Sequence, residues 1–162
     1  MPNRYSYLVF VCCVSTEGGN SENFAKYVKI LQILEYDLNA LKDINVPSIL
    51  YGDFNAHIGD TSTKHEIEGN NKRVGKNGQL LHDWLNKWGK VVINNQPITA
   101  GKWTWQKGSS TSILDLMIID QKMVNFIDAL IIDDERGVTT TNTDHNTLVS
   151  LLNTGYERIK WE

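Results

Sequence analysis

The feature that most constrains the fold is the seven-residue run Ile113 to Ile119, which is apolar except for a single carboxylate, Asp115. A strand with apolar side chains on both faces belongs inside a sheet that other elements cover on both sides. The run therefore predicts a layered fold with a central, covered sheet rather than a helical bundle.

Two segments repeat apolar residues at helical spacing, Glu22 to Lys42 and Gly78 to Trp88. Ser21 is a plausible cap for the first helix, and Gly89 is the expected stop of the second. The side chains expected to face the core are Phe24, Val28, Leu31, Leu34, Leu38 and Leu41 in the first helix and Leu81, Trp84, Leu85 and Trp88 in the second.

Short apolar and β-branched segments predict strands at 5–14, 48–51, 91–94, 103–105, 113–119, 126–132 and 148–152. Strands separated by helices and then followed by several short strands predict an α/β or α+β fold, with sheets flanked by helices. At 162 residues the chain has the length of one domain.

The net charge of -3 argues against a protein that coats nucleic acid through concentrated positive charge. The charges are unevenly distributed, because eight cations and only three carboxylates lie between Lys64 and Lys107. Such a stretch helps to bind phosphates, and the alternative is an ordinary solvated surface.

Cys12 and Cys13 are adjacent, so on a strand they point to opposite faces and have no spacing for a zinc site. We expect reduced thiols in an intracellular protein. The segment Tyr7 to Val14 lacks a small-x-small cleavage pattern, and a buried strand is favoured over a signal peptide. No run reaches the ~18 apolar residues of a membrane span.

The sharpest polar motif is Tyr51-Gly52-Asp53-Phe54-Asn55, where an expected strand leaves the sheet. The alternating geometry of a strand end places Asp53 and Asn55 on the same side. Their oxygens suit a hard metal ion, a proton or an attacking water. The alternative interpretation is an Asx turn in which Asp53 caps the bend.

Asp115 lies inside an apolar run, where a charge is costly unless it is paired or hydrogen-bonded. A histidine is an attractive partner, because a buried carboxylate fixes the tautomer of an imidazole and raises its pKa. A β-bulge or an ion pair with a lysine are the alternatives.

Thr143-Asp144-His145 precedes the last expected strand. Asp144 is a candidate metal ligand, and His145 is a candidate for contacting a phosphate and for reaching Asp115 if their strands are neighbours. A surface turn is the alternative.

Taken in order, Gly52-Asp53-Phe54-Asn55, Gly101-Lys102-Trp103-Thr104-Trp105, Ser112-Ile113-Leu114-Asp115 and Thr143-Asp144-His145 resemble the motifs of the endonuclease/exonuclease/phosphatase superfamily. The Lys-Trp-Thr-Trp and Ser-Ile-Leu-Asp forms are most similar to the endonuclease domains of non-LTR, LINE-type retrotransposons. The resemblance covers about Leu8 to Leu152 and implies a four-layer sandwich of two mainly antiparallel sheets flanked by helices.

The resemblance implies that Asp53 activates water or protonates the leaving oxygen and that Asn55 orients the nucleophile or the phosphate. It also implies that Asp115 supports His145, which stabilises the pentacoordinate phosphate. Asp144, with Asp53 and Asn55, is expected to hold Mg²⁺ or Mn²⁺. Thr104 and Thr143 are expected to contact the substrate.

This sequence also departs from the family pattern. Members begin with strands that carry an Asn and then a metal-binding Glu, and nothing before Tyr5 supplies either. Cys13 stands near the position of a usual catalytic Tyr, and Thr143 stands where Ser is usual. We therefore expect a partial domain at 1–155, incomplete at its N-terminal side, and a tail at 156–162.

The function expected from the sequence is metal-dependent hydrolysis of DNA phosphodiesters, weakened by the missing Asn and Glu. One alternative is a phosphodiesterase or phosphatase of the same superfamily that acts on RNA or small phosphate esters. Another is a non-catalytic remnant that binds DNA or a protein, and an incomplete sheet edge would favour a protein partner or aggregation. A retroelement nuclease would act in the nucleus, and no membrane association is expected.

Overall fold

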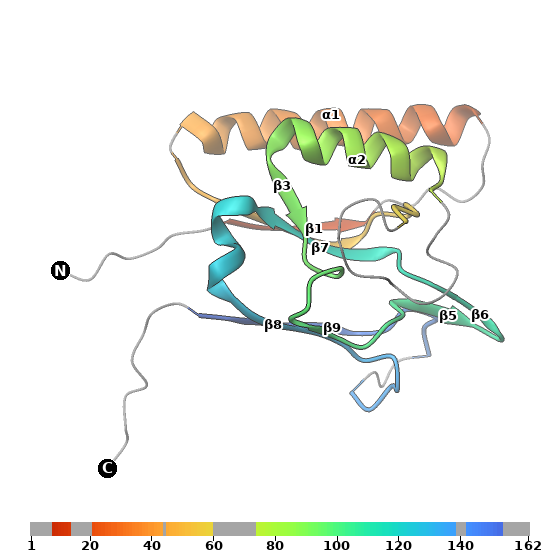
Figure 1. Cartoon of the computed structure of the whole chain (residues 1–162). Coiled ribbons are helices and arrows are strands. Elements are labelled where there is room, and N and C mark those ends of the chain that lie inside the picture. Colours follow the sequence, from red (N-terminus) through yellow and green to blue (C-terminus); the bar gives the residue numbers. More distant parts are fainter. Residues whose placement is uncertain (1–7, 14–20, 44, 60–73, 139–141, 154–162) are drawn as a thin grey trace, which may run out of the picture.

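The computed structural model describes residues 8–13, 21–43, 45–59, 74–138 and 142–153. A pair of helices, a four-stranded sheet and a three-stranded sheet are stacked in that order (Figure 1). The expected α/β class, with mainly antiparallel sheets and covering helices, is confirmed. The expected tail at 156–162 lies outside the described residues.

The first sheet has the strand order β1-β2-β7-β3. Its strands are β1 (Leu8–Cys13), β2 (Ser48–Asp53), β7 (Asp115–Asp120) and β3 (Lys90–Val92). β1 runs parallel to β2, whereas β7 runs antiparallel to both β2 and β3. Residues 116–119 of β7 are all buried, as the apolar run predicts, because β7 is an inner strand covered on both faces.

Helices α1 (Ser21–Asp43) and α2 (Lys76–Trp88) cover one face of this sheet. Gly89 ends α2 in the left-handed conformation, with φ of 59°, as expected of a helix stop. The prediction that Phe24 faces the core at the start of α1 is wrong. Phe24 is 37% exposed, and Tyr27 is fully buried instead. Tyr27, Leu31, Leu34 and Leu38 follow the regular three- and four-residue spacing, and Phe24 lies one turn before this buried stripe begins.

The second sheet has the order β4-β8-β9 and packs on the other face of the first sheet. Its strands are β4 (Thr99–Ala100), β8 (Ile127–Ile132) and β9 (Leu148–Leu152). A 3-10 helix, η2 (Gln121–Phe126), connects β7 to β8. The core between the sheets consists of Ile49, Ile93, Met117, Ile119, Met123, Ile127 and Leu130.

A two-stranded ribbon, β5 (Trp105–Lys107) and β6 (Ser110–Ser112), extends from one end of the stack (Figure 1). A strand at 103–105 was expected, but β5 begins at Trp105. The turn at Gly108, whose φ is 59°, fixes the pairing of Lys107 with Ser110 and so sets the register.

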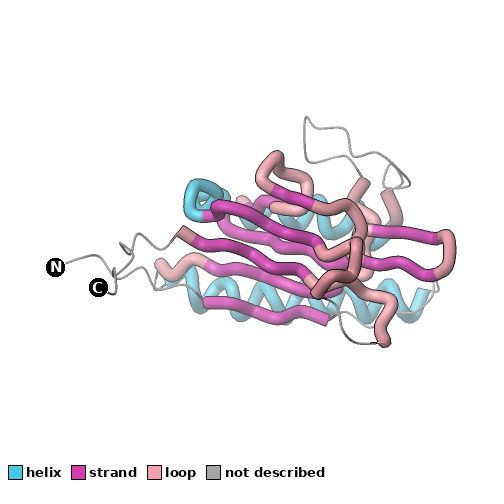
Figure 2. The backbone as a smooth tube through the Cα atoms, turned by 90° about the horizontal axis from the view of Figure 1, so that it is seen from below, coloured by secondary structure: helices cyan, strands magenta, loops and turns pink. Residues whose placement is uncertain are grey.

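The outer face of the second sheet has no helix on it among the described residues (Figure 2). Ile131, Val149 and Leu151 on β8 and β9 are between 39% and 51% exposed. The described part of the chain thus holds three of the four layers expected for the family. None of the described helices is sufficiently long and apolar to cross a bilayer.

Gly78 allows α2 to pack against the loop that follows β2. A Cβ atom at this position would lie 1.8 Å from the backbone oxygen of His57, so the substitution Gly78→Ala forces the helix away from the loop. We expect a loss of at least ~2 kcal/mol in the free energy of unfolding, measured by urea denaturation, although Ala favours helix by ~1 kcal/mol. Gly75→Ala is the control, because its Cβ meets nothing closer than 3.9 Å. Equal stability of the two variants would contradict this packing.

Candidate active site

Two carboxylates meet where β2 ends and β7 begins. Asp53 and Asp115 are directly opposite each other in the antiparallel register. The pairing continues one step further, because the Phe54 N–H donates to the carbonyl of Leu114 over 2.9 Å. Tyr51 packs toward the second sheet, so Asp53, two residues along the same strand, projects to the same side. Both acids therefore lie at the rim between the two sheets.

The turn after β2 is fixed by Asp53 itself. The Asn55 N–H donates to Oδ1 of Asp53 over 2.7 Å, and Asn55 has a left-handed φ of 44°. This is the Asx-type turn of the alternative interpretation, and it coexists with the placement of Asp53 at the rim. Asn77 at the start of α2 donates to the Asn55 carbonyl over 3.3 Å and holds the turn from outside.

Asp115 has the imidazole partner that its burial predicts. His145 Nδ1 lies 2.8 Å from Asp115 Oδ2, and the side chain of Asp115 is only 14% exposed. His145 is positioned from the other side by a β-bridge to Trp105. Its remaining ring nitrogen, Nε2, lies 3.9 Å from Oδ1 of Asp144. The Thr143-Asp144-His145 segment is thereby brought to the Asp53 and Asp115 rim.

Burial and the charges at this rim raise the pKa of two groups. Burial alone lowers the pKa of His145, but the hydrogen bond and the charge of Asp115, helped by Asp53 and Asp144, raise it above its ordinary 6.5. Burial raises the pKa of Asp53, and Asp115 adds to this effect. An imidazole and a carboxyl that both take up a proton more readily than usual thus lie close together.

Asp144 has a more open environment. Its carboxylate accepts a hydrogen bond from the side chain of Trp105, which is the main reason that its pKa is lowered. Lys107 Nζ lies 4.0 Å from Oδ2 of Asp144. Asp144 is therefore ionised at neutral pH and faces solvent next to His145.

The two threonines expected to contact the substrate serve the backbone of this site. Thr104 is fully buried, and its hydroxyl accepts the N–H groups of Leu114 over 2.8 Å and Asp115 over 2.9 Å. The Thr143 hydroxyl accepts the N–H of His145 over 3.2 Å. Thr104 fixes the position where β7 begins, and Thr143 shapes the turn that presents His145.

Comparisons with known proteins give the family. The sequence profile of a family described as Endonuclease-reverse transcriptase matches residues 9–149. The chain belongs to this family. The family resemblance that the ordered motifs indicated is therefore confirmed. None of the curated protein sequences compared matches the chain.

Solved structures of nucleases have the same fold as this family member. A 3′-5′ exonuclease from Neisseria meningitidis is 15% identical, with a TM-score of 0.63, and the match covers 90% of this chain and 60% of that one. An AP endonuclease from Archaeoglobus fulgidus is 16% identical, with a TM-score of 0.56 and coverages of 90% and 61%. A second structure of the Neisseria protein, described as a 3′ phosphatase bound to a product DNA hairpin, is 15% identical, with a TM-score of 0.62 and coverages of 89% and 60%. The chain spans about three fifths of the length of these proteins.

Two buried asparagines that the sequence analysis did not single out hold the rim of this family member together. Asn94, just after β3, donates to the carbonyl of Asp115 over 3.0 Å and accepts the N–H of Met117 over 2.8 Å. Asn146 donates to the carbonyl of Trp103 over 2.6 Å. The sequence pattern could have indicated a structural role for Asn94. This amide ends the apolar run 91–93, and a buried amide needs hydrogen-bond partners.

The donors at this rim do not complete a metal centre. Among the described residues, no group of three or more His, Cys, Asp or Glu side chains could hold a metal ion. Asp53 and Asp144 are hard oxygen donors of the type that Mg²⁺ or Mn²⁺ takes, but they are too few for a site on their own.

The basic stretch between Lys64 and Lys107 does not form one face in the described part of the chain. Lys107 lies beside Asp144, whereas Lys87 pairs with Glu35 and Lys90 pairs with Asp120 at the other end of the sheet. The cations at 64, 72 and 73 lie outside the described residues.

The substitution Asp115→Asn tests the pairing with His145. It removes the main contribution that raises the pKa of His145, so we expect this pKa to fall, as measured by NMR titration of the ring protons. Because the folded pKa is raised, the stabilisation is fully present below about pH 6.5 and is lost as the pH rises through the folded pKa. The stability difference from wild type should therefore be larger at pH 5.5 than at pH 8.5. Asp128→Asn on the exposed side of β8 should leave the titration unchanged, and the same fall in both variants would contradict the pairing.

The substitution Thr104→Val tests the fixing of β7. It keeps the shape but leaves two buried N–H groups without an acceptor, at about 1–3 kcal/mol each. We expect a loss of roughly 2–6 kcal/mol in the free energy of unfolding from guanidinium denaturation. Thr104→Ser keeps the hydroxyl and loses one methyl group, at about 1 kcal/mol. If Val were tolerated as well as Ser, the hydroxyl would not have this role.

Proposed function

We propose that the chain carries the phosphate-contacting part of a DNA phosphodiester hydrolase of endonuclease type that uses Mg²⁺ or Mn²⁺. One observation carries the proposal: Asp53, Asp115, Asp144 and His145, from three distant segments, lie at one rim of two packed sheets in a member of the Endonuclease-reverse transcriptase family. The proposed domain extends over residues 1–155.

The chemistry of phosphodiester hydrolysis matches the charges at this rim. An in-line attack builds negative charge on the phosphate oxygens, and fixed positive charge or N–H donors near them lower the barrier. In the proposal, His145 donates from Nε2 to a phosphate oxygen while Asp115 holds Nδ1 and keeps the ring cationic. This assignment uses the nitrogen that Asp115 does not occupy.

Asp53 and Asn55 are proposed to act on the nucleophile. The raised pKa of Asp53 suits a group that takes a proton from water or gives one to the leaving oxygen. Asn55 is proposed to orient the nucleophile or the phosphate. Asp144, which stays ionised, is proposed as a ligand of the divalent ion, with Asp53 and Asn55 as further oxygen donors; when bound, such an ion supplies Lewis-acid stabilisation of the phosphate.

DNA is proposed as the substrate on three grounds. The family description joins endonuclease with reverse transcriptase. The similar structures include a Neisseria exonuclease, which a second structure shows with a product DNA hairpin, and an AP endonuclease. Lys107 at the tip of β5 adds a cation next to Asp144. A retroelement nuclease of this type would work in the nucleus.

A second candidate is non-catalytic DNA binding, favoured by the shortage of metal ligands among the described residues. The rim would then contact phosphates through His145 and Lys107 without cleaving them. Salt-sensitive binding of duplex DNA without turnover would support this candidate. Hydrolysis of RNA or of small phosphate esters without DNA nicking would instead support another activity of the superfamily.

A nicking assay on supercoiled plasmid with Mg²⁺ or Mn²⁺ tests the proposed function. Because the described donors do not complete a metal centre, we expect weak or no nicking by this chain alone. Any nicking should require the metal ion and should drop at least ~100-fold in His145→Ala, which loses the proposed phosphate contact. Asp128→Ala, an exposed carboxylate on β8, is the control and should keep the wild-type rate.

The possible outcomes test the assigned site residues separately from the expectation of weak nuclease activity. Nicking that survives in both His145→Ala and Asp144→Ala would contradict the assigned site. Robust Mg²⁺-stimulated nicking that is abolished in Asp144→Ala would support the site and overturn the expectation of weak activity. DNA binding that weakens with salt, and no detectable nicking at any metal concentration, would replace the hydrolase by the binding candidate.

A further inference from the structure

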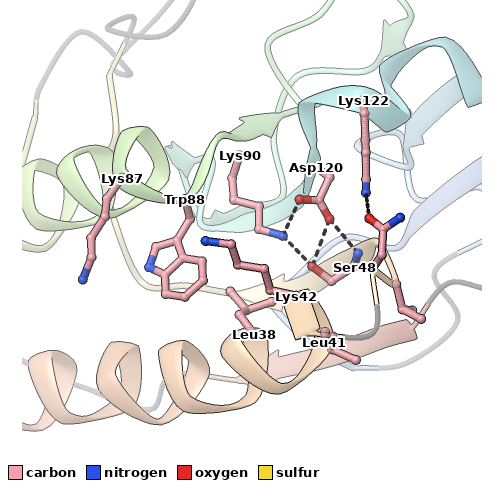
Figure 3. Close-up of a pocket in the computed structure, with 11 residues that line it drawn as sticks. Leu38, Leu41, Lys42, Ser48, Lys87, Trp88, Lys90, Asp120 and Lys122 are labelled. Carbon is pink, nitrogen blue, oxygen red and sulfur yellow. Dashed lines mark hydrogen bonds and ion pairs between the residues drawn. The ribbon is translucent and has the colours of Figure 1, made fainter.

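The two ends of β7 are held in different ways. At one end, Lys90 Nζ lies 3.1 Å from Asp120 Oδ1, and the backbone N–H of Ser48 donates to Asp120 Oδ2 over 2.7 Å (Figure 3). These residues belong to β3, β7 and β2, so this end is tied together within the first sheet. At the other end, Asp115 takes its partner, His145, from a segment outside that sheet. The placement of the imidazole therefore depends on what holds that segment.

The main chain on both sides of His145 is fixed from the side of β5. The Gln106 N–H donates to the carbonyl of Asp144 over 2.8 Å. The Asn146 N–H donates to the carbonyl of Thr104 over 2.7 Å. Because Asp144 and Asn146 flank His145, a movement of either one is passed directly to the imidazole.

The Asn146 side chain ties its own segment to two others. Its amide oxygen, Oδ1, accepts the Nε2–H of Gln106 over 3.2 Å and the Nε–H of Arg136 over 3.0 Å. Its amide nitrogen donates to the carbonyl of Trp103 over 2.6 Å. Asn146 is only 4% exposed, so water cannot readily replace a bond that is lost. Since its donor is ionised, the bond from Arg136 is stronger than the neutral bond from Gln106.

The loop after β8 presents Arg136 in an unusual backbone conformation. Arg136 has a left-handed φ of 57°, which glycine adopts easily and a residue with a Cβ atom adopts rarely. Asp133 closes the loop, because its Oδ1 and Oδ2 accept the N–H groups of Gly137 and Val138, each over 2.8 Å. The backbone alone would favour glycine at position 136. An arginine there indicates that its side chain is used, and the bond to Asn146 is such a use.

We propose that Arg136 is a positioning residue of the candidate active site and acts on His145 through Asn146. Arg136 holds Oδ1 of Asn146, and the main chain of Asn146 directly continues that of His145. A fixed Asn146 keeps the imidazole at its distance of 2.8 Å from Asp115. The value of this role for catalysis rests on the proposed function, in which the same imidazole contacts the phosphate.

Two substitutions of similar length separate the hydrogen bond from the charge. Arg136→Gln places a side-chain N–H the same number of bonds from the backbone as Nε, so it keeps a donor without the charge. Arg136→Met fills similar space and has no donor. Because both variants lose the charge, a difference between them reports on the hydrogen bond to Asn146.

NMR of the His145 Nδ1–H, the proton on the nitrogen that faces Asp115, tests the proposal in the folded chain. A hydrogen bond to a carboxylate moves this signal far downfield. Arg136→Met should move it back upfield and speed its exchange with solvent about fivefold, because one net hydrogen bond changes an equilibrium by about that factor. Arg136→Gln should keep the wild-type signal. Lys29→Met, which removes an exposed cation on α1, is the control and should change neither property.

Urea denaturation of the same variants separates positioning from simple stabilisation. A lower urea midpoint in Arg136→Met with an unmoved His145 signal would show a merely structural role and would overturn the proposal. An equal change of the signal in the Gln and Met variants would also overturn it, since the charge and not the hydrogen bond would then be responsible. So would a Met variant that does not fold.

The plasmid-nicking assay keeps this role distinct from the proposed function. If the wild type nicks, Arg136→Met should lower the turnover rate about tenfold with little change in the KM for DNA, because a displaced catalytic group loses rate rather than binding. Arg136→Gln should restore the rate, and an unchanged rate in Arg136→Met would contradict the role. If the wild type does not nick, the hydrolase proposal fails, and the His145 signal still decides whether Arg136 positions the ring.

Discussion

The pairing of Asp115 with His145 is the interaction on which the rest of the site depends. Asp115 begins an inner strand of a covered sheet, where an unpaired carboxylate would cost several kcal/mol. His145 satisfies it over 2.8 Å from the segment that leads into β9, which belongs to the other sheet. One polar contact therefore joins the two sheets and also sets the orientation of the imidazole. Thr104 and Asn94 bind the backbone around Asp115, so the position of this carboxylate is fixed before any ligand arrives.

Strand β7 shows how one segment builds two polar ends around an apolar middle. Its first residue, Asp115, pairs with His145, and its last, Asp120, pairs with Lys90. The residues between them, 116–119, are buried against the helices on one face and the second sheet on the other. Burial of the middle holds the strand in register, and the register places each carboxylate opposite its partner. The candidate active site and the Lys90–Asp120 ion pair thus lie at the two ends of the same strand.

The sequence predicted the layers well and the short strands less well. The period of the apolar residues identified both helices, and the run Ile113 to Ile119 identified the covered inner strand. β4 and β6 are only two and three residues long, so their position depends on contacts with distant segments and leaves no periodic signal. The partner of Asp115 could be predicted because the cost of a buried charge demands one. The pairing of Asp120 with Lys90 could not, because a carboxylate at a strand end can equally well remain in water.

The same reasoning explains why the roles of individual threonines and asparagines were harder to foresee. A hydroxyl or amide at a strand end can contact a ligand, water or the backbone, and only the neighbouring chain decides between these. Thr104 is fully buried because the strand that leads to Asp115 passes directly over its hydroxyl. The groups at the rim are constrained more strongly, since the charge of each alters the protonation of the next: burial lowers the pKa of His145, and Asp115, Asp53 and Asp144 together raise it above its ordinary value. In the proposed function, His145 contacts a phosphate with or without a metal ion, so the hydrolase and the DNA-binding candidates share one arrangement and differ in what completes it.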